Sequence, residues 1–409
     1  MDTIERTITD WIGAGEAELA EVISLRRDIH ADPEIGLDCA RTTAKIKAAL
    51  AGLPLEFREG PSTSGLVAIL RGGGDNGRAV LLRGDMDALP MQEETGLPFA
   101  SQVPGAMHAC GHDSHSAMLV GAARALCARR DSLPGTVVFM FQPGEEGYHG
   151  ARYMLEDGLL DDVLPGRRPD AAFALHISPN MRRGAFVSRP GPLLASADTL
   201  TATITGRGGH AAMPHETLDP IPVACEIVTA LQAYIARQVP VMDPAVLSIT
   251  KITAGSAHNI IPTSAELLGT LRTLSEETRE RGQAAFERIV EHVAAAHGMT
   301  AMAHVESGYP VTRNDPQATD FMRRCAADLV GEANWIEMAA PIMGAEDFAY
   351  VLRELPGAMA FLGVAPEGSD PATNPSLHNT RMTIDESMMA RGIAMHCTLA
   401  ERFLASAFD

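Results

Sequence analysis

The chain has 409 residues, of which 46% are hydrophobic and 21% charged, and its formal net charge is −19. This composition is typical of a soluble globular protein, and the length exceeds what one ordinary hydrophobic core supports, so we expect two domains. The acidic balance argues against a nucleic-acid partner, which requires a basic surface, and against an anionic membrane surface.

The first 32 residues have an acidic, amphipathic pattern with no continuous apolar run. This pattern predicts a helix and argues against a secretory signal. No run in the chain approaches the roughly 18 apolar residues that a membrane helix needs. Six cysteines are scattered along the chain. Without an export signal, we expect a cytoplasmic protein whose cysteines are reduced.

Helical periodicities and short apolar runs alternate through the first half of the chain. Such alternation predicts an α/β fold with a mostly parallel sheet covered by helices. The expected elements are, in order, helix over 4–51 broken at 32–34, strands over 65–70 and 79–82 joined by a glycine-rich turn, a helix over 113–130, a strand over 135–141, a helix over 148–160 and a strand over 170–177.

A second module starts near residue 185. Its order, β-α-β-β-α-β, is that of a ferredoxin-like α+β unit. Helix–strand alternation resumes after about residue 311, so we expect the small domain to be inserted into the larger one, with domain ranges 1–185, 186–309 and 310–409. The module's expected elements are a strand over 199–206, a helix over 220–237, strands over 245–254 and 265–274, a helix over 275–298 and a strand over 300–306.

The most informative stretch is His108-Ala-Cys-Gly-His-Asp113, which combines a thiol, two imidazoles and a carboxylate. Thiolate and imidazole are ligands suited to zinc and neighbouring divalent metals. Because Cys110 and His112 stand two residues apart, both can reach one ion from a single loop. The stretch therefore predicts a metal site.

Three expected strands run into polar groups: Arg83-Gly-Asp85-Met-Asp87, Gln142-Pro-Gly-Glu145-Glu146, and His176. In open α/β sheets, functional groups gather at the carboxyl ends of strands, so we expect these groups to meet. The adjacent glutamates can divide the work. One binds metal, and the other takes a proton from water whose pKa a divalent ion lowers to about 7. Taken alone, the pair would indicate a solvated acidic turn.

These motifs resemble those of the metal-dependent aminoacylase, hippurate hydrolase and auxin-conjugate amidohydrolase family. The resemblance extends from about Arg26 to His378. The motifs that carry it appear in family order and are Arg83-Gly-Asp-Met-Asp-Ala-Leu-Pro90, Met107-His-Ala-Cys-Gly-His-Asp113, Gln142-Pro-Gly-Glu-Glu146, Ala174-Leu-His176, Gly206-Arg-Gly-Gly-His-Ala-Ala-Met-Pro-His215, His258-Asn-Ile-Ile-Pro262, Gly269-Thr-Leu-Arg272 and Ser376-Leu-His378.

The resemblance implies two divalent metal ions per subunit, with zinc, manganese, cobalt and nickel all suited to the donor set. It implies that Glu145 is the general base and that Asp87 orients a ligand from behind. Asp85 is left between such a supporting role and an ordinary strand-end turn. The implied metal ligands are Cys110, His112, Glu146, His176 and His378.

In the inserted domain, the resemblance implies that His210 stabilises an oxyanion, often from a partner subunit. A structural or solvent-facing histidine is the alternative. Asn259 and Arg272 are expected to contact the substrate, because an arginine fork suits a free α-carboxylate. Arg272 in a surface ion pair is the alternative there. Gly344 is expected to line the pocket.

The resemblance thus implies a metal-dependent amidohydrolase that cleaves small-molecule N-acyl-amino acids with metal-activated water and Glu145 as base. A dipeptidase or carboxypeptidase using the same site is the nearest alternative. A non-catalytic binding homologue is a third, disfavoured because the expected ligands and base are all present. The inserted domain is expected to serve as a lid and dimerisation domain, giving a homodimer or a higher homo-oligomer.

Overall fold

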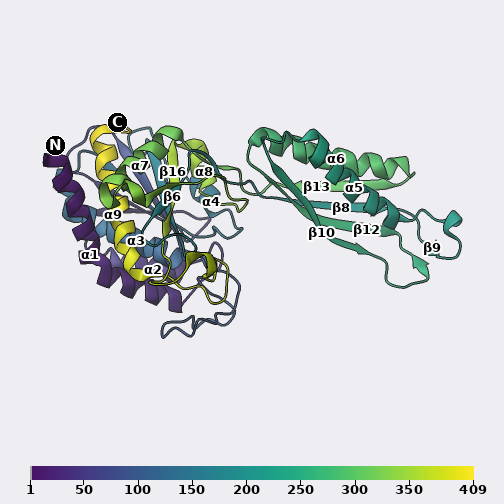
Figure 1. The fold of residues 1–409 in the computed structure, drawn as a ribbon, viewed down its shortest axis with the longest axis horizontal. Helices are drawn as coiled ribbons and strands as arrows, with labels where there is room; N and C mark the ends of the chain where they lie inside the picture. The colour runs from purple at the N-terminus through teal and green to yellow at the C-terminus, as the bar shows by residue number, and fades with distance from the viewer. Residues whose placement is uncertain (1) are drawn as a thin grey trace. The chain divides into compact units, whose positions relative to one another are not determined.

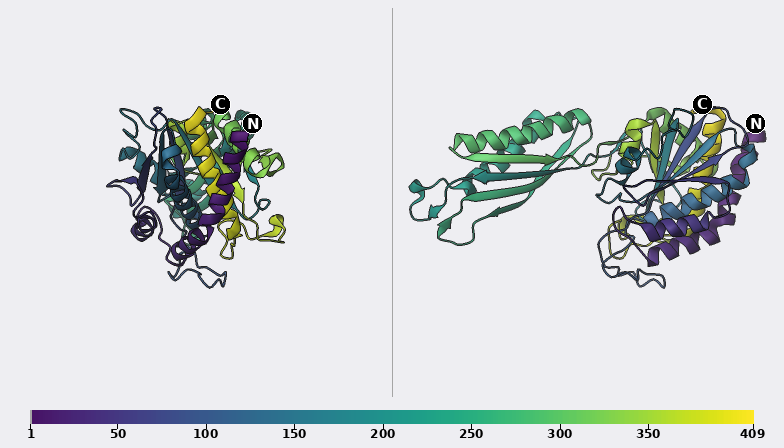
Figure 2. Two further views of the ribbon diagram at one scale, coloured as in Figure 1. Left: turned by 90° about the vertical axis from the view of Figure 1, so that its left-hand side faces the viewer. Right: turned by 180° about the vertical axis from the view of Figure 1, so that it is seen from behind.

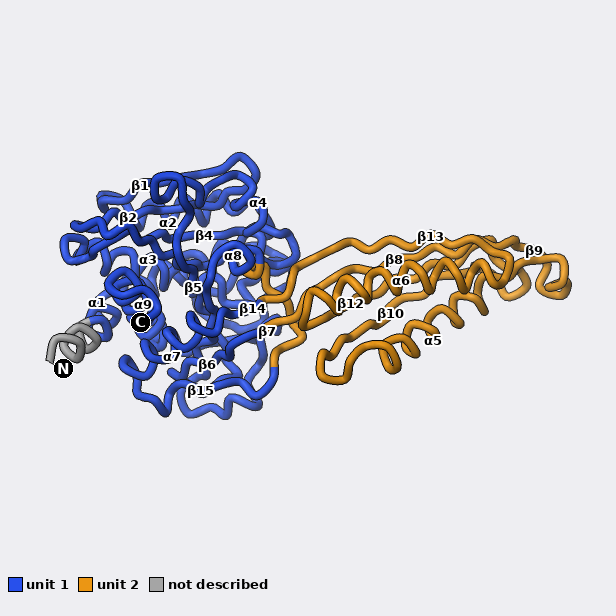
Figure 3. Tube along the Cα trace, turned by 90° about the horizontal axis from the view of Figure 1, so that it is seen from above, with its two compact units in different colours: residues 1–191, 313–340, 350–409 blue, residues 192–312, 341–349 orange. Residues whose placement is uncertain are grey.

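The computed structural model describes residues 2–409, with side chains from residue 11 onward. The chain divides into two compact units, coloured separately in Figure 3. Unit 1 comprises Met1–Gly191, Arg313–Ala340 and Tyr350–Asp409, and unit 2 comprises Pro192–Thr312 and Pro341–Ala349. The sequence suggested boundaries at 185/186 and 309/310, slightly earlier than the first two crossings, and it assigned Pro341–Ala349 to the larger domain, whereas the structure places this segment in unit 2. The chain leaves unit 1 within β7 (Gly191–Leu194) and returns within β14 (Thr312–Asn314).

Within its described residues, unit 1 is built on an eight-stranded mixed sheet with the order β1-β2-β4-β3-β5-β16-β6-β15. The four central strands, β4, β3, β5 and β16, are parallel, and antiparallel pairs flank them on both sides. The strands are β1 (Leu55–Glu59), β2 (Leu66–Arg71), β3 (Ala79–Asp85), β4 (Thr136–Gln142), β5 (Ala171–Ser178), β6 (Phe186–Ser188), β15 (Trp335–Glu337) and β16 (Gly357–Gly363).

The central strands are buried along their whole length. Their near-continuous apolar sequences are typical of parallel strands that are covered on both faces. Helices α3 and α9 pack against the strands, and α1 packs on both of them (Figures 1 and 2). The helices of unit 1 are α1 (Asp2–Ala31), α2 (Ala40–Ala49), α3 (His112–Ala128), α4 (Gly150–Glu156), α7 (Pro316–Val330), α8 (Ala349–Glu354) and α9 (Met389–Ser406).

Two local expectations differ from the structure. The helix expected over 148–160 is limited to α4, because Gly147 and His149 both have positive φ and hold the preceding residues in a turn. Strands β2 and β3, which the sequence joins by a glycine-rich turn, are not neighbours, since β4 lies between them. That turn instead runs beside the segment before β4, where Gly74 N donates to Leu133 O.

Unit 2 contains a four-stranded antiparallel sheet with the order β10-β12-β8-β13, against which α5 and α6 pack (Figure 1). Along β8, buried Leu200, Ala202 and Ile204 alternate with less buried threonines, as a sheet with one covered face requires. The elements are β8 (Asp198–Thr205), α5 (Pro220–Gln238), β10 (Ala245–Ala254), β12 (Ser264–Thr273), α6 (Glu276–Ala296) and β13 (Thr300–Glu306). The predicted fold class, an α/β domain carrying a ferredoxin-like insert, is confirmed.

Among the described residues, no helix combines the length and the apolar character that crossing a membrane requires.

Candidate metal centre

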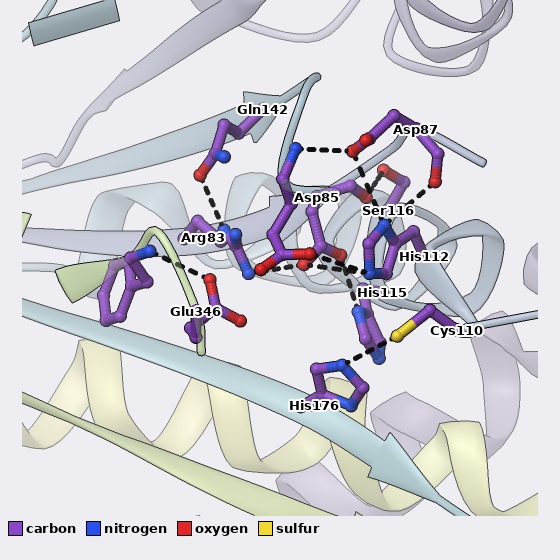
Figure 4. A network of polar contacts seen from close by, with 12 residues as sticks. Arg83, Asp85, Asp87, Cys110, His112, His115, Ser116, Gln142, His176 and Glu346 are labelled. Atoms are coloured by element: carbon purple, nitrogen blue, oxygen red, sulfur yellow. Dashed lines mark hydrogen bonds and ion pairs between the residues drawn. The ribbon is translucent and has the colours of Figure 1, made fainter. Parts of the chain in front are cut away.

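The polar groups of the site lie where three parallel strands end. Strands β3, β4 and β5 run in one direction, so their carboxyl ends meet at the same edge of the sheet (Figure 4). Asp85 ends β3 and pairs with Gln142 at the end of β4. His176 stands near the end of β5. The convergence expected from the sequence is therefore present.

The loop that carries Cys110 and His112 leads into helix α3. Its bend is at Gly111, which has a φ of +84°. A Cβ at this position would lie 2.5 Å from Ile177 Cδ1, so both the backbone conformation and the space require glycine. Cys110 and His112 are both buried, and their donor atoms lie within 4.8 Å of each other.

Hydrogen bonds at Nδ1 decide which nitrogen each imidazole offers. His112 Nδ1 donates to the backbone oxygen of Asp87 at 2.9 Å, and His176 Nδ1 donates to the backbone oxygen of Ile177 at 2.7 Å. With Nδ1 used by the backbone, Nε2 is the nitrogen that each ring can offer to a metal. His176 Nε2 lies 3.4 Å from Cys110 Sγ, and the donor atoms of Cys110, His112 and His176 all lie within 4.8 Å of one another.

The two glutamates are held by Asp87. Its carboxylate accepts hydrogen bonds from the backbone nitrogens of Glu145 and Glu146, at 2.9 and 3.0 Å. Donor atoms of Glu145 and Glu146 lie within 4.8 Å of one another and of a nitrogen of His112. Asp87 thus fixes the backbone of the glutamate loop through its side chain and His112 through its carbonyl.

His378 completes the cluster from a distant part of the chain. It has a φ of +62°, a conformation that costs a non-glycine residue roughly 1–3 kcal/mol. Its backbone nitrogen donates to Ala109 O at 2.9 Å, and its Nε2 lies 3.2 Å from Glu146 Oε1. Cys110, Glu146 and His378 form a second group of donor atoms within 4.8 Å of one another.

Two buried atoms test whether this cluster fits a metal. His112 Nε2 is shielded from solvent and lacks a hydrogen-bond partner, and the equally shielded Glu146 Oε1 has only the ion-pair contact with His378 Nε2, itself an expected ligand, at 3.2 Å. A buried polar atom without a partner costs about 1–3 kcal/mol, so such atoms indicate a missing group. Thiol, imidazole and carboxylate donors around one point suit a divalent metal. The residues present therefore fit a bound divalent ion.

The electrostatics of the site also favour a cation. Burial alone would lower the pKa of His112, but Asp85 and Asp87 outweigh burial and raise it to about 10. Burial and the nearby Glu146 raise the pKa of the Cys110 thiol well above its usual value. A divalent cation would reverse both effects, because it favours the thiolate and the neutral imidazole.

A buried hydrogen-bond network, to which the sequence analysis gave no definite role, lies next to the expected ligands (Figure 4). His115 Nδ1 donates to Asp85 Oδ1 at 2.6 Å, and its Nε2 accepts from the backbone nitrogen of Ile177 at 2.8 Å. Both nitrogens of His115 thus have partners within the fold. Arg83 pairs with Asp85 and donates to Gln142 Oε1 at 2.9 Å.

This network bears on the two alternatives left for Asp85. Its carboxylate is fully buried among Arg83, His115 and His112, which favours the supporting role over an ordinary strand-end turn. Burial opposes its ionisation, but Arg83 and His112 hold the pKa of Asp85 well below its usual value. The sequence contained one indication of this role for His115, because it follows His112 by three residues on one helix and so lies on the same helix face.

The remaining predicted site residues lie in unit 2. His210 belongs to the short strand β9 (Gly209–His210), which pairs with β11 (Ile260–Ile261), and Ala211 N donates to Asn259 O at 3.1 Å. His210 and Asn259 are therefore neighbours. His210 Nδ1 accepts the backbone N–H of Ala212 at 3.0 Å, which leaves the proton on Nε2.

Arg272 and Gly344 stand apart from that pair in the sequence. Arg272 lies in β12, half-buried, and its Nε donates to Thr270 Oγ1 at 3.2 Å. Burial lowers the pKa of its guanidinium. The backbone oxygen of Gly344 accepts from Ala195 N at 2.8 Å. Among the described residues, Arg272 forms no surface ion pair, and its contact with substrate stays a prediction.

The parallel strands of this helix-covered sheet end in a buried thiol, imidazoles and carboxylates. This fold and donor set are those of a metal-dependent amidohydrolase. Residues 81–402 match Peptidase family M20/M25/M40, and the chain belongs to this family.

Three similar proteins illustrate the range of the family. Thermostable carboxypeptidase 1 of Saccharolobus solfataricus is 36% identical, with 98% of this chain and 99% of the relative covered. N-acetylcysteine deacetylase of Bacillus subtilis is 37% identical, with 92% and 95% covered. The crystal structure of a Bacillus subtilis protein described as a dinuclear metal-binding peptidase of the M20 family has a TM-score of 0.80 at 34% identity, with 96% and 99% covered.

Proposed function

We propose that this protein hydrolyses the amide bond of N-acyl-amino acids and releases a carboxylic acid and a free amino acid. The observation that carries the proposal is the position of Glu145, a buried carboxylate beside a donor set that fits divalent metal. The similarity to a deacetylase of an N-acetylated amino acid supports this substrate class.

Two divalent ions per subunit are proposed, held by five side chains. The two groups of donor atoms, which share Cys110, and the dinuclear relative support this number. Zinc, manganese, cobalt and nickel all suit such donors. When bound, the ions would polarise the scissile carbonyl and acidify the attacking water. The ligands are Cys110, His112, Glu146, His176 and His378.

Glu145 is the general base and then the general acid. Its carboxylate takes a proton from the attacking water as the new carbon–oxygen bond forms, and it gives that proton to the nitrogen as the carbon–nitrogen bond breaks. Asp87 holds the backbone of Glu145 and Glu146, so each carboxylate keeps its own task.

Unit 2 supplies the substrate contacts in this proposal. His210 has a protonated Nε2, so it is able to donate to the oxyanion that the carbonyl oxygen becomes when water attacks the carbonyl carbon. Asn259 and Arg272 bind the free α-carboxylate, and Gly344 lines the pocket. Unit 2 also serves as the lid and the dimerisation domain. The protein is then a cytoplasmic homodimer or higher homo-oligomer, and the His210 that acts in an active site comes from the same subunit or from its partner.

A carboxypeptidase or dipeptidase is the second candidate. The similarity to a carboxypeptidase over nearly the whole chain favours it, and the same base and ligands would serve. The two candidates differ only in whether an acyl group or an amino acid occupies the other side of the amide. A non-catalytic binding role is disfavoured because the base and all five proposed ligands are present.

The deciding experiment is a substrate panel on protein loaded with one defined metal. Hippurate, N-acetyl-amino acids, N-acetylcysteine and dipeptides are compared by kcat/KM, with the released amino acid measured directly. We expect N-acyl-amino acids to be hydrolysed fastest. Faster cleavage of dipeptides would favour the carboxypeptidase or dipeptidase, and no cleavage of any amide by the metal-loaded protein would refute both.

A further inference from the structure

A buried arginine on the N-terminal helix contacts the loop that carries two of the proposed ligands. Arg26 Nε lies 2.7 Å from Asp113 Oδ2, and both side chains are almost completely shielded from solvent. Asp113 directly follows His112. His30, one helical turn after Arg26, adds a contact from Nδ1 to the same Asp113 oxygen at 2.8 Å. A buried carboxylate requires such partners, because removing one leaves an uncompensated charge.

The same guanidinium also contacts the segment that carries His378. Arg26 NH1 donates to Glu386 Oε1 at 3.0 Å. Between His378 and Glu386, the chain packs on the metal loop, because Met382 forms an apolar cluster with Met107 and Ala109. The backbone bond from His378 to Ala109 adds a second link between the two segments.

We infer that Arg26 is a positioning residue that ties together the two ligand-bearing segments of the metal centre, residues 108–113 and 378–386. The inference rests on the ligand assignment of the proposed function. Arg26 does not touch the ions or the substrate in this proposal. It acts through Asp113 and Glu386, and thereby sets the distance between the Cys110–His112 pair and His378.

The shape of the arginine side chain makes this bridge specific. One guanidinium reaches both carboxylates, with Nε at ion-pair distance from Asp113 and NH1 donating to Glu386, and the ring of Phe99 lies 5.2 Å from its central carbon. A guanidinium spreads its charge over three nitrogens and can contact two carboxylates at once, whereas a lysine ammonium is a single point charge. Arg26→Lys therefore keeps the charge that Asp113 needs but cannot hold both segments.

The neighbouring Arg27 is a matched control. It bonds the same carboxylate, with NH2 at 2.5 Å from Glu386 Oε2, but its side chain is 47% exposed and its ion pair is with Glu386 and not with Asp113. It also lies over the ring of Phe99, at 4.7 Å. Arg27→Lys therefore changes the same surroundings without breaking the bridge.

The experiment measures zinc and manganese binding to the full-length, metal-free protein by calorimetric titration, together with the melting temperature of that metal-free protein. We expect Arg26→Lys to remain folded at the titration temperature and to bind at least one of two ions 10-fold or more weakly. Arg27→Lys should bind both ions like the wild type. The kcat of loaded Arg26→Lys should fall while KM changes little, because the substrate contacts lie elsewhere. Wild-type dissociation constants for both ions in folded Arg26→Lys would overturn the inference.

A second variant covers the case in which Arg26→Lys does not fold. Glu386→Ala removes the link to the His378 segment at a partly exposed position and leaves the pair of Arg26 and Asp113 intact. It should weaken one ion selectively and leave the other unchanged, and two unchanged ions would again overturn the inference. A wild-type protein that binds no divalent ion would refute the proposed function and this inference together, whereas equal binding by wild type and Arg26→Lys refutes the inference alone.

Discussion

The Nδ1 of His112 donates to the backbone oxygen of Asp87 at 2.9 Å, while the carboxylate of Asp87 accepts the backbone N–H groups of Glu145 and Glu146. A single residue, Asp87, thus holds the proposed metal ligand His112 and the loop that carries both the carboxylate ligand Glu146 and the base Glu145.

Replacing the Asp87 carboxylate tests that relationship. Asp87→Asn turns one acceptor into an N–H group that faces a backbone N–H, so either Glu145 or Glu146 loses its partner. We expect kcat/KM to fall about 10- to 100-fold, the usual effect of changing a group behind a metal ligand. The exposed Asp28→Asn serves as control, since its side chain is 64% exposed, and it should leave kcat/KM unchanged. Wild-type kcat/KM in Asp87→Asn would contradict the role.

The adjacent glutamates should respond differently to the same change. Glu145→Gln should lower kcat by at least about 100-fold with normal metal content, because it removes only the proton acceptor. Glu146→Gln should instead reduce metal content. Elemental analysis and turnover of both variants check this pair. Reduced metal in Glu145→Gln, or full activity in it, would remove Glu145 from its proposed role.

Cys110 should matter for metal binding more than for folding. Cys110→Ser replaces a soft thiolate donor by a weaker hydroxyl donor, so we expect fewer bound ions per chain by elemental analysis and a melting temperature that responds less to added metal. Cys225, which is exposed in unit 2, provides the control variant Cys225→Ser. Equal metal stoichiometry in the two variants would exclude Cys110 as a ligand.

A pH effect on stability is expected at Glu93, away from the proposed ligands. Burial opposes its ionisation, but hydrogen bonds from His30, Ser101 and Thr95 lower its pKa from 4.5 to about 2. A lowered pKa in the folded state adds stability above pH 4.5, and that stability is lost as the pH falls towards 2.

Urea unfolding of Glu93→Gln tests this effect. At pH 7 the variant should be less stable than the wild type by about 1–3 kcal/mol, and the difference should shrink at pH 3. The neighbouring Glu94→Gln is the control, because Glu94 is 54% exposed and pairs with Arg381 at the surface. A difference that does not depend on pH would contradict the assigned cause.

Several features of the site could be predicted because they depend on local sequence. The thiol and imidazole of the Cys110–His112 loop, the double glutamate after an apolar strand and the order of elements in the insert all follow from residue type and spacing. The resemblance to a family added His378, which lies far away in the sequence and carries no local signal of its own.

Other features depended on contacts between distant segments. The sequence left Asp85 undecided and gave His115 no role, because only the packing of β3, α3 and β5 shows that Asp85 and Ile177 use both nitrogens of His115. The insertion of β4 between β2 and β3 likewise depends on strand pairing and not on the order of strands in the chain.

By itself, the sequence determined which donor atoms exist and which loops carry them, since ligand type and short spacing are properties of the covalent chain. The tertiary structure decided which nitrogen of each imidazole is available to a metal. Hydrogen bonds from Nδ1 to the backbone oxygens of Asp87 and Ile177 leave Nε2 for that role in His112 and His176, and Arg26 joins segments that the sequence separates by about 260 residues. Lone-pair direction and the distance between segments are set by partners remote in the sequence, so only folding fixes them.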